Sequence, residues 1–565
     1  MSLFSAVQVG RNAMMASQLG LQVVGNNIAN ANTEGYIRES LVLAPAPTQR
    51  KGDLLLGLGV DVKAVTQRVD RFLQERLRNA SSDKAHGEAL EGVYLQLESV
   101  IGELGDTDLS TSIDNFFGSL NDILNQPESE SVRNLAALLG DTLASDLRRL
   151  RDRVAGVREG VNTQVINAAK DMNRLLEEIS RLNVQIVSAE GGGASQSDAV
   201  GLRDSRDVAL ARLSELIGIR TTEQPDGSVT VFVGGDFVVW QGEYRAVEVT
   251  LAADRGLAAA AIQIAETDVP LSTQSGKLGG LIRARDEALG GFLDSLDAFA
   301  STLIYEFNKM HSSGQGLTGY TQMTSEFPVE NTQTALDSAG LTFSPTNGSL
   351  TVHVLNRQTG LTQTTDILVP LNGLDDDLTL EDLAAALDEV DGLSASITVT
   401  KQLRISADSP LVEFAFADDT SGVLAALGLG GFFTGSDAAT IGVNETIKAD
   451  PTKFAASKGG IGADTENAVE LAGFLDKKLE TAGAATLGTL YDGMISETTQ
   501  AAAVSRSVAE GFRVFELTLE GQHLALSGVS LDEEAINMIV FQRMFQAAAR
   551  FVTTVSEMLD VLVNI

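Results

Sequence analysis

Four histidines are the side chains of this chain most able to bind a metal or to move protons near neutral pH. They are His86, His311, His353 and His523. None has a second histidine or a cysteine at the spacing of metal ligands. Cysteine is absent, which excludes disulfides, thiolate metal sites and a cysteine nucleophile. These residues predict no metal and no cofactor.

Two further segments could suggest a ligand site. The acidic run Asp375–Asp377 lacks the alternating ligands, the central glycine and the distal glutamate of a calcium loop, so we interpret it as a solvated turn. Gly191–Gly193 is followed by no Lys-Ser/Thr pair, so it is not a phosphate-binding loop. No serine lies in a nucleophile elbow. We therefore expect no catalytic residue and no enzyme.

Heptad spacing is the dominant pattern at the C-terminal end, over residues 528–565. One set of apolar residues recurs every seven positions, and a second set fills the intermediate seam position. The first set is Leu531, Met538, Phe545, Val552 and Leu559, and the second is Phe541, Ala548, Val555 and Leu562. This pattern predicts a coiled-coil helix whose apolar seam faces a partner helix.

The N-terminal end, residues 1–35, carries a similar stripe. It consists of Val7, Met14, Leu21 and Ile28, with Leu3 and Val24 beside it. Arg11 is the only charge before Glu34, and a nearly uncharged helix at a chain end is expected to be buried against something. We predict that the two terminal helices lie side by side and antiparallel. Their partners could lie in the same chain or in a neighbouring copy.

A motif follows the first helix. It contains Asn26, Asn27, Asn30, Asn32, Gly35 and Tyr36. Asparagine suits a helix end because it tolerates left-handed backbone and hydrogen-bonds nearby main chain, and glycine permits a sharp exit. The order of these residues resembles the N-terminal signature of the axial proteins of the bacterial flagellum, the rod, hook and hook-associated proteins. Glu34 departs from the proline that is frequent there.

The C-terminal segment resembles the same family. Ser527–Glu534 precedes the last helix, and Phe541–Ala547 follows within it. Ser530 and Glu533 have the spacing of a capping box, in which each side chain satisfies a backbone amide at the helix start. The acidic residues 532–534 also favour the positive end of the helix dipole. The resemblance therefore implies that both chain ends take part in assembly.

The middle of the chain separates the members of this family. Between Leu143 and Ile186 apolar residues alternate gaps of three and four, which predicts one long helix. Breaks flank it at Asn125–Pro127 and Gly191–Gly193. A long helical block resembles a hook-associated protein more than a hook or distal-rod protein. Residues 275–281, with Arg285, Asn308, His311 and Gly314, and the β-hairpin expected at 226–235, resemble such a protein as well.

Residues 312–450 differ in character. Short β-rich runs alternate with turn residues, and one helix is expected from Leu380 to Val390 with Thr379 and Asp382 as a capping pair. Residues 312–460 hold 19 Asp and Glu against 6 Lys and Arg. We predict an acidic β-rich insertion.

The expected fold class is multidomain α+β, with terminal coiled-coil helices, a helical-bundle middle with a β-hairpin arm, and an inserted β-rich outer domain. We expect a terminal domain at 1–75 and 516–565, forming an inner tube. We expect a mainly helical domain at 76–311 and 451–515, with a β-hairpin near 221–265, and an outer domain at 312–450.

Composition limits the partners and the compartment. The net charge of −35 and pI of about 4.4 argue against nucleic acid, which requires a basic surface. No apolar run is long enough to span a membrane, so we expect no membrane insertion. The N-terminus lacks the basic region and apolar core of a cleaved signal peptide.

The resemblance implies a structural adaptor that joins hook to filament. Copies would form a ring, with hook protein on one side and the next hook-associated protein on the filament side. It also implies export through the flagellar channel without signal cleavage, an extracellular position, and a small helical export chaperone that binds the C-terminal helix. Two alternatives remain: another axial protein such as the hook protein, or an exported surface enzyme or adhesin that uses residues 312–450.

Overall fold

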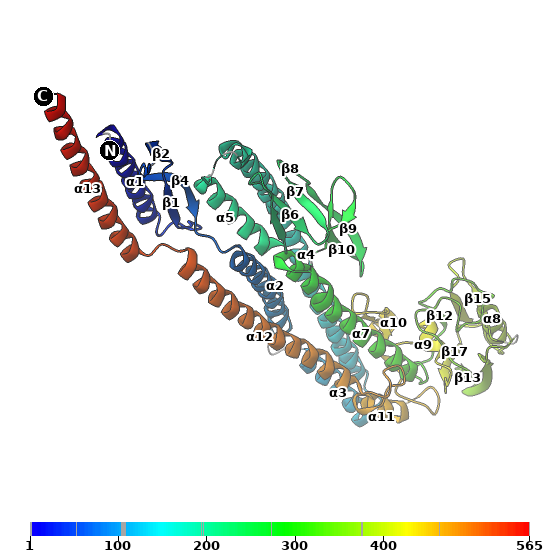
Figure 1. Ribbon diagram of the computed structural model, residues 1–565. Coiled ribbons are helices and arrows are strands. Elements are labelled where there is room, and N and C mark those ends of the chain that lie inside the picture. The colour runs from blue at the N-terminus through cyan, green and yellow to red at the C-terminus, as the bar shows by residue number, and fades with distance from the viewer. Residues whose placement is uncertain are drawn as a thin grey trace. The chain divides into compact units, whose positions relative to one another are not determined.

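The computed structural model describes residues 3–51, 54–102, 109–193, 195, 197–272, 274–374, 377–462 and 464–563. The chain divides into two compact units. Unit 1 comprises Met1–Tyr94, Glu159–Arg285 and Ala503–Ile565, and unit 2 comprises Leu95–Arg158 and Asp286–Ala502. Figure 1 shows long helices and small sheets, which is the expected α+β class.

The helices of unit 1 include both chain ends. They are α1 (Leu3–Ala29), α5 (Val200–Leu216), α6 (Gly276–Arg283) and α13 (Leu531–Val563), with a short 3₁₀ turn at Gly191–Gly193. Three long helices contribute residues to both units, namely α2 (Arg71–Gly102), α4 (Glu130–Ala189) and α12 (Leu487–Ser527). The expected long helix is confirmed as α4. The first helix ends at Ala29, not at residue 35, because the asparagine-rich segment forms turns.

The strands of unit 1 form antiparallel sheets. Two are two-stranded: β1 (Glu39–Pro45) with β4 (Val60–Gln67), and β2 (Thr48–Lys51) with β3 (Leu54–Gly57). The segment near 221–265, expected as one hairpin, forms two larger sheets. The first contains β5 (Arg220–Glu223), β6 (Val229–Val233), β7 (Asp236–Trp240) and β8 (Glu243–Tyr244), and the second contains β9 (Val247–Asp254), β10 (Leu257–Ile264) and β11 (Val269–Pro270).

Three asparagines of α4 hold these two sheets. Each side-chain amide donates to a backbone carbonyl and each side-chain oxygen accepts from a backbone N–H, as a peptide group would. Asn183 bonds both ways to Val229, and Asn173 bonds both ways to Val247. Asn162 bonds Ala258 and Ala260. These bonds satisfy strand groups that would otherwise be buried without partners.

Unit 2 contains helices around a phenylalanine core. The helices are α3 (Leu109–Asn125), α7 (Gly290–His311), preceded by a π-helical turn at Ala284–Leu289, α10 (Glu445–Ala449) and α11 (Glu466–Ala472), with 3₁₀ turns at Pro451–Lys453 and Phe474–Asp476. Seven buried rings pack on one another with centroids about 5–6 Å apart. They are Phe116, Phe117, Phe307, Phe432, Phe433, Phe454 and Phe474.

The β-rich insertion of unit 2 has its own core. Its strands are β12 (Gln322–Thr324), β13 (Gly348–Asn356), β14 (Leu361–Val369), β15 (Leu393–Ile397), β16 (Leu403–Ala407) and β17 (Val412–Ala417), in sheets ordered β12-β16-β15 and β14-β13-β17. Helices α8 (Leu380–Asp388) and α9 (Val423–Leu427) contribute to the same core, which extends from Val329 to Leu429. The expected capping box of Thr379 and Asp382 is confirmed.

The end of the insertion belongs to the helical core. Phe432 and Phe433, with the short pair β18 (Phe433–Thr434) and β19 (Gly442–Val443), pack against Phe116 and Phe307. The Asn308 amide on α7 accepts from the N–H groups of Phe432 and Phe433 and donates to the Phe433 carbonyl. Residues 430–450, which the sequence pattern assigned to the insertion, therefore include side chains of the bundle core.

His311 is buried beside the phenylalanine rings of this core. Its Nδ1 lies 2.9 Å from the Gly430 carbonyl, and its Nε2 accepts from the Ala455 N–H at 3.0 Å. These bonds fix the neutral tautomer with its proton on Nδ1. Burial lowers the pKa of His311 to about 4. The ring is a structural member of the core.

Candidate assembly site

The two terminal helices of unit 1 pack against each other. Figure 1 shows α1 and α13 side by side. Gly10 lies against Phe551 and Val552, Gly20 lies against Phe541, and Asn27 bonds Glu534. Because higher numbers on α1 meet lower numbers on α13, the helices are antiparallel, as the two seams predicted.

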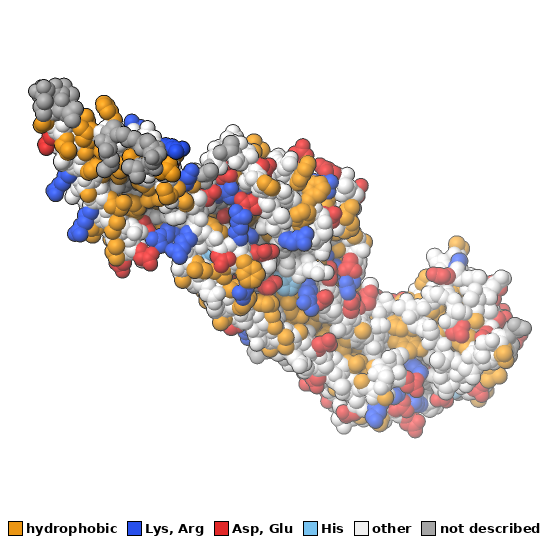
Figure 2. All heavy atoms as spheres, in the orientation of Figure 1, with side chains coloured by type: hydrophobic (Ala, Val, Ile, Leu, Met, Phe, Trp, Pro, Cys, Tyr) orange, Lys and Arg blue, Asp and Glu red, His pale blue; other side chains and the backbone are white. Residues whose placement is uncertain are grey.

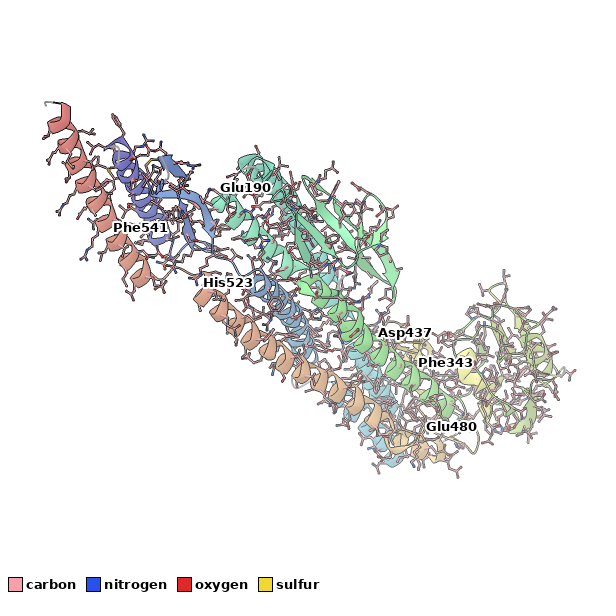
Figure 3. The ribbon with its side chains drawn as sticks, viewed as in Figure 1. Glu190, Phe343, Asp437, Glu480, His523 and Phe541 are labelled. Carbon is pink, nitrogen blue, oxygen red and sulfur yellow. The ribbon has the colours of Figure 1, made fainter. Side chains whose placement is uncertain are left out.

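Small residues form the face of α1 that meets α13. A Cβ added at Gly20 would lie 2.5 Å from the Phe541 ring, so this close approach requires glycine. Phe541 lies between the two helices in Figure 3. The buried residues of α1 are Ala6, Gly10, Ala16, Ser17, Gly20, Val23, Val24 and Asn27. Sequence reasoning missed this seam because small residues carry little hydrophobic signal, although positions 6, 10, 13, 17, 20, 24 and 27 alternate gaps of four and three.

The stripe expected to form the α1 seam is only half buried. It comprises Leu3, Val7, Met14, Leu21 and Ile28. On a helical wheel these positions lie on one flank of the small-residue seam rather than at its centre. Another face of α1 contacts β1 and β4, and Asn12 donates to the carbonyl of Leu58, between β3 and β4, at 3.1 Å.

The α13 seam corresponds more closely to the heptad pattern. Ala548 and Val555 are buried, and Phe541, Phe545, Val552 and Leu559 are half buried. Leu531 is 54% exposed because α1 ends at Ala29, before it could cover this residue. Met538 is 39% exposed. The side chain of Leu562 lies outside the described part of the structure.

The remaining surface of α13 is apolar. Figure 2 shows hydrophobic side chains gathered over the terminal helices. The exposed apolar residues are Ile536, Ile539, Val540, Met544, Phe551, Met558 and Val561 on α13, with Phe4 and Met15 on α1. A helix that is apolar on several faces is normally buried, and large exposed apolar patches mark interaction sites.

A polar node joins the two terminal motifs. Asn27 is buried and makes four hydrogen bonds: its amide donates to the Glu39 carbonyl and to Glu534, and its oxygen accepts from the Tyr36 hydroxyl and the Glu39 N–H. Arg38 pairs with both Glu533 and Glu534 at 2.6 Å. Its backbone N–H also donates to the Ser527 carbonyl. We call Asn27, Arg38 and Glu534 the polar node.

Other motif residues shape the turn after α1. Asn26 donates to the Glu39 carboxylate, and Asn30 donates back to Asn26 and accepts from Thr33. Gly35 has a φ of +74°, and a Cβ there would lie 2.2 Å from Val208. Asn32 is exposed. The motif therefore shapes the path of the chain between α1 and β1.

Electrostatics around the motif follow from burial. Burial, followed by the neighbouring Glu39 carboxylate, raises the pKa of the Tyr36 hydroxyl above its usual range. Burial also raises the pKa of Glu39, although its hydrogen bond from Asn26 acts in the opposite direction. Tyr36 therefore keeps its proton and remains a donor to Asn27.

The capping box expected at the start of α13 is half formed. The Glu533 N–H lies 3.5 Å from the Ser530 hydroxyl. The Glu533 side chain pairs with Arg38. The Glu533 carboxylate, which would complete the capping box, therefore forms the ion pair with Arg38 instead.

The residues considered for chemistry are dispersed. The four histidines lie on α2, α7, β13 and α12. Within the described ranges, no group of three or more His, Asp or Glu is placed to hold a metal ion. Asp377 accepts from the N–H groups of Asn372 and Gly373 and so closes its own turn, whereas Asp375 and Asp376 lie outside the described residues. No helix in the part of the chain that the structure describes is long and apolar enough to cross a membrane.

Family models match three parts of the chain. Residues 94–327 match the flagellar hook-associated protein FlgK helical domain, residues 520–565 the flagellar basal body rod FlgEFG protein C-terminal model, and residues 8–36 the flagella basal body rod protein model. Both chain ends therefore resemble flagellar rod proteins, and the helical middle resembles a flagellar hook-associated protein.

Full-length relatives narrow this class. Flagellar hook-associated protein 1 of Bacillus subtilis (strain 168) is 25% identical over 100% of this chain and 98% of the relative. The proteins of the same name from Salmonella typhimurium (strain LT2) and Escherichia coli (strain K12) are 23% and 24% identical, each over 99% of this chain and 100% of the relative. Over its full length, the chain is therefore similar to the flagellar hook-associated protein 1 of these bacteria.

A solved structure has a similar fold. The flagellar hook junction protein FlgK from Burkholderia pseudomallei superposes with a TM-score of 0.50 at 17% identity, covering 80% of this chain and 100% of that chain. This likeness concerns the fold alone.

Proposed function

We propose that copies of this chain assemble into a ring that joins the flagellar hook to the filament through their paired terminal helices. The observation that carries the proposal is the apolar surface of α13 that α1 leaves uncovered. Ile536 and Val561 on this helix are 63% and 61% exposed. Neighbouring copies would cover these residues, since apolar burial is the main driving force of association.

The residues expected to act in assembly fall into two groups under this proposal. The α13 seam from Phe541 to Leu559 packs on α1 of the same chain. The flank formed by Leu3, Val7, Met14, Leu21 and Ile28, together with the exposed face of α13, would contact neighbours. Head-to-tail contacts of this kind close into a ring or continue as a helix, depending on the rotation between copies.

The partners follow from the place of the family in the flagellum. Hook protein would contact one side of the ring, and the next hook-associated protein would contact the filament side. The chain would leave the cell through the flagellar channel without signal cleavage and would act outside the cell. Before export, a small helical chaperone would cover the apolar face of α13. The role is mechanical and requires no catalysis.

We also propose a revised outer domain. Its core extends from Val329 to Leu429, whereas Phe432 and Phe433 pack in the bundle. The domain of the ring that faces outward would therefore end near residue 429 instead of 450. The terminal domain would comprise α1, β1–β4 and α13.

Complementation tests the function. The gene is deleted in the source bacterium, and the intact chain or a chain lacking residues 531–563 is returned. We expect hooks without filaments and flagellin shed into the medium in the deletion strain, with rescue by the intact chain only. Attached filaments in the deletion strain would contradict a junction role. Rescue by the truncated chain would contradict assembly through α13.

A further inference from the structure

The seam between α1 and α13 repeats every seven residues and is therefore ambiguous in register. On α1 the seam residues are nearly all small, so most of them accept any apolar side chain from α13. Sliding α13 by one heptad again places apolar residues opposite small ones. Repeating seams of this kind need a polar residue to select one register.

Two features of the described seam do not repeat every seven residues: the contact of Gly20 with Phe541, and the polar node. Asn27 and Glu534 are both buried, at 1% exposure each. Glu534 receives the Asn27 amide at 3.2 Å and the Arg38 guanidinium at 2.6 Å. Both oxygens of this buried carboxylate are therefore paired in the observed register.

A slip of one heptad would break the two bonds that Glu534 accepts in this node, from Asn27 and from Arg38. In one direction Glu534 would move from Asn27 to the level of Gly20, which has no side-chain donor. In the other direction it would pass the end of α1 at Ala29. Either slip leaves a carboxylate and a guanidinium without their partners, and unpaired buried charges are strongly unfavourable.

We propose that Asn27, Arg38 and Glu534 form a register lock, which selects one alignment of the two terminal helices and contributes little to their attraction. The inference rests on the proposed function, because it assumes that α1 and α13 pair in the assembled shaft. The lock assigns a role to both terminal motifs. Asn27 lies in the N-terminal motif and Arg38 directly after it, whereas Glu534 lies in the C-terminal motif. As positioning residues they would set which faces of the pair neighbouring copies meet.

The absence of cysteine makes register measurable by disulfide formation. The contacts of Gly10 and Gly20 bracket Ala13 and place it opposite Ala548. Ala13→Cys with Ala548→Cys reports the observed register. Ala6→Cys with Ala548→Cys reports a slip of one heptad, because seven helical residues rise about 10 Å, beyond disulfide reach.

Each cysteine pair is built into the full chain with or without Glu534→Leu, and shafts isolated from the source bacterium are oxidised. The matched control is Glu533→Leu, because Glu533 also pairs with Arg38 but its side chain is 60% exposed. A second variant, Arg38→Met with Glu534→Leu, removes both charges and leaves no guanidinium unpaired.

We call the disulfide between Cys at positions 13 and 548 the 13/548 bridge, and the one between positions 6 and 548 the 6/548 bridge. We expect only the 13/548 bridge in the parent and in Glu533→Leu. In Glu534→Leu and in the double variant, we expect the 6/548 bridge to rise at least tenfold while the 13/548 bridge remains. A 13/548 bridge alone in both variants would overturn the lock. Loss of both bridges would also overturn it, because the node would then hold the helices together instead of aligning them. Absence of the 13/548 bridge in the parent would instead contradict the pairing itself and hence the proposed function.

Discussion

The phenylalanine core of unit 2 and the terminal helix pair of unit 1 use apolar residues in opposite ways. In unit 2, the rings of Phe116, Phe307 and Phe433 are at most 1% exposed and contact one another from helices and strands far apart in sequence. In the terminal pair, small residues fill the seam and large apolar residues such as Phe551 lie partly outside it. One region completes its core within the chain, and the other leaves large apolar side chains exposed.

The difference also concerns polar groups. Side chains in unit 2 bond backbone groups: Asn308 holds Phe432 and Phe433, and Arg133 donates to the Phe454 carbonyl. The two terminal helices are joined to each other by bonds between side chains, from Asn27 and Arg38 to Glu534. Backbone bonds fix a fold, whereas bonds between side chains of two helices align those helices. Stability and assembly should therefore respond to different mutations.

The largest effect on thermal unfolding should come from the choice of the C-terminal boundary when the insertion is deleted. Deleting residues 320–445 removes Phe432 and Phe433 from the bundle core, and we expect the purified chain to lose cooperative thermal unfolding. Deleting 319–428 with a short Gly-Ser bridge keeps both rings. Equal melting of the two deletions would contradict the revised boundary.

Phe307→Ala should destabilise the monomer by about 3–5 kcal/mol, as large-to-small changes of buried aromatics do. Its ring contacts Phe116, Phe433 and Phe474. The matched control is Leu361→Ala, because Leu361 is 72% exposed. Urea unfolding measures both. A loss for Phe307→Ala no larger than for the control would show that the ring cluster is not the stabilising core.

Gly20→Leu should block entry into the shaft, since its side chain would occupy the position of the Phe541 ring. Because the clash is a matter of volume, Phe541→Ala in the same chain should restore entry at least in part. Gly25→Leu is the control, since nothing lies within 4 Å of a Cβ at Gly25. Filament counts after complementation provide the measurement, and failure of the compensating pair would argue against this packing.

One buried group in each unit should make stability depend on pH, and the two groups act with opposite signs. Burial raises the pKa of Asp204 in unit 1 to about 7, from about 4 when unfolded. The folded state therefore holds a proton that the unfolded state has lost, and this group lowers stability as pH rises from 4 to 7. His311 in unit 2 has a pKa of about 4, against about 6.5 unfolded, so it lowers stability as pH falls from 6.5 to 4.

Urea unfolding of Asp204→Asn and His311→Gln across this range tests both signs. Relative to the parent chain, Asp204→Asn should gain stability toward pH 7, and His311→Gln should gain toward pH 4. Variant curves that run parallel to the parent curve would contradict both assignments.

Local patterns made part of this molecule predictable. The three-and-four spacing from Leu143 to Ile186 indicated α4, and the heptads of the last helix indicated the seam from Phe541 to Leu559. The antiparallel pairing followed from two seams at opposite chain ends. These features depend on neighbours within a few turns of one helix, which a single sequence records directly.

Other features depend on contacts between distant residues. Phe432 and Phe433 look like part of a β-rich run, and only their packing on Phe116 and Phe307 places them in the bundle. The α1 seam was missed because Gly10 and Gly20 matter through the size of Phe541 and Val552 opposite them. Glu534 was assigned to a helix start, although its partner Asn27 lies 507 residues away.

Phe545→Asp tests the separation of fold and assembly most directly. Phe545 lies half buried in the middle of the α13 seam. Its replacement puts a charge into that seam while leaving the phenylalanine core untouched. Monomer melting, capture by the proposed export chaperone and motility are compared with Glu557→Gln, a change at an exposed position of the same helix. We predict that the main melting transition of the Phe545→Asp monomer, which reports the phenylalanine core, stays within about 2 °C of the parent, a change expected from well under 1 kcal/mol, yet the variant fails to enter the shaft. A monomer that melts many degrees lower, or a mutant that melts normally and still swims, would contradict the claim that the terminal pair is an assembly surface distinct from the folded core.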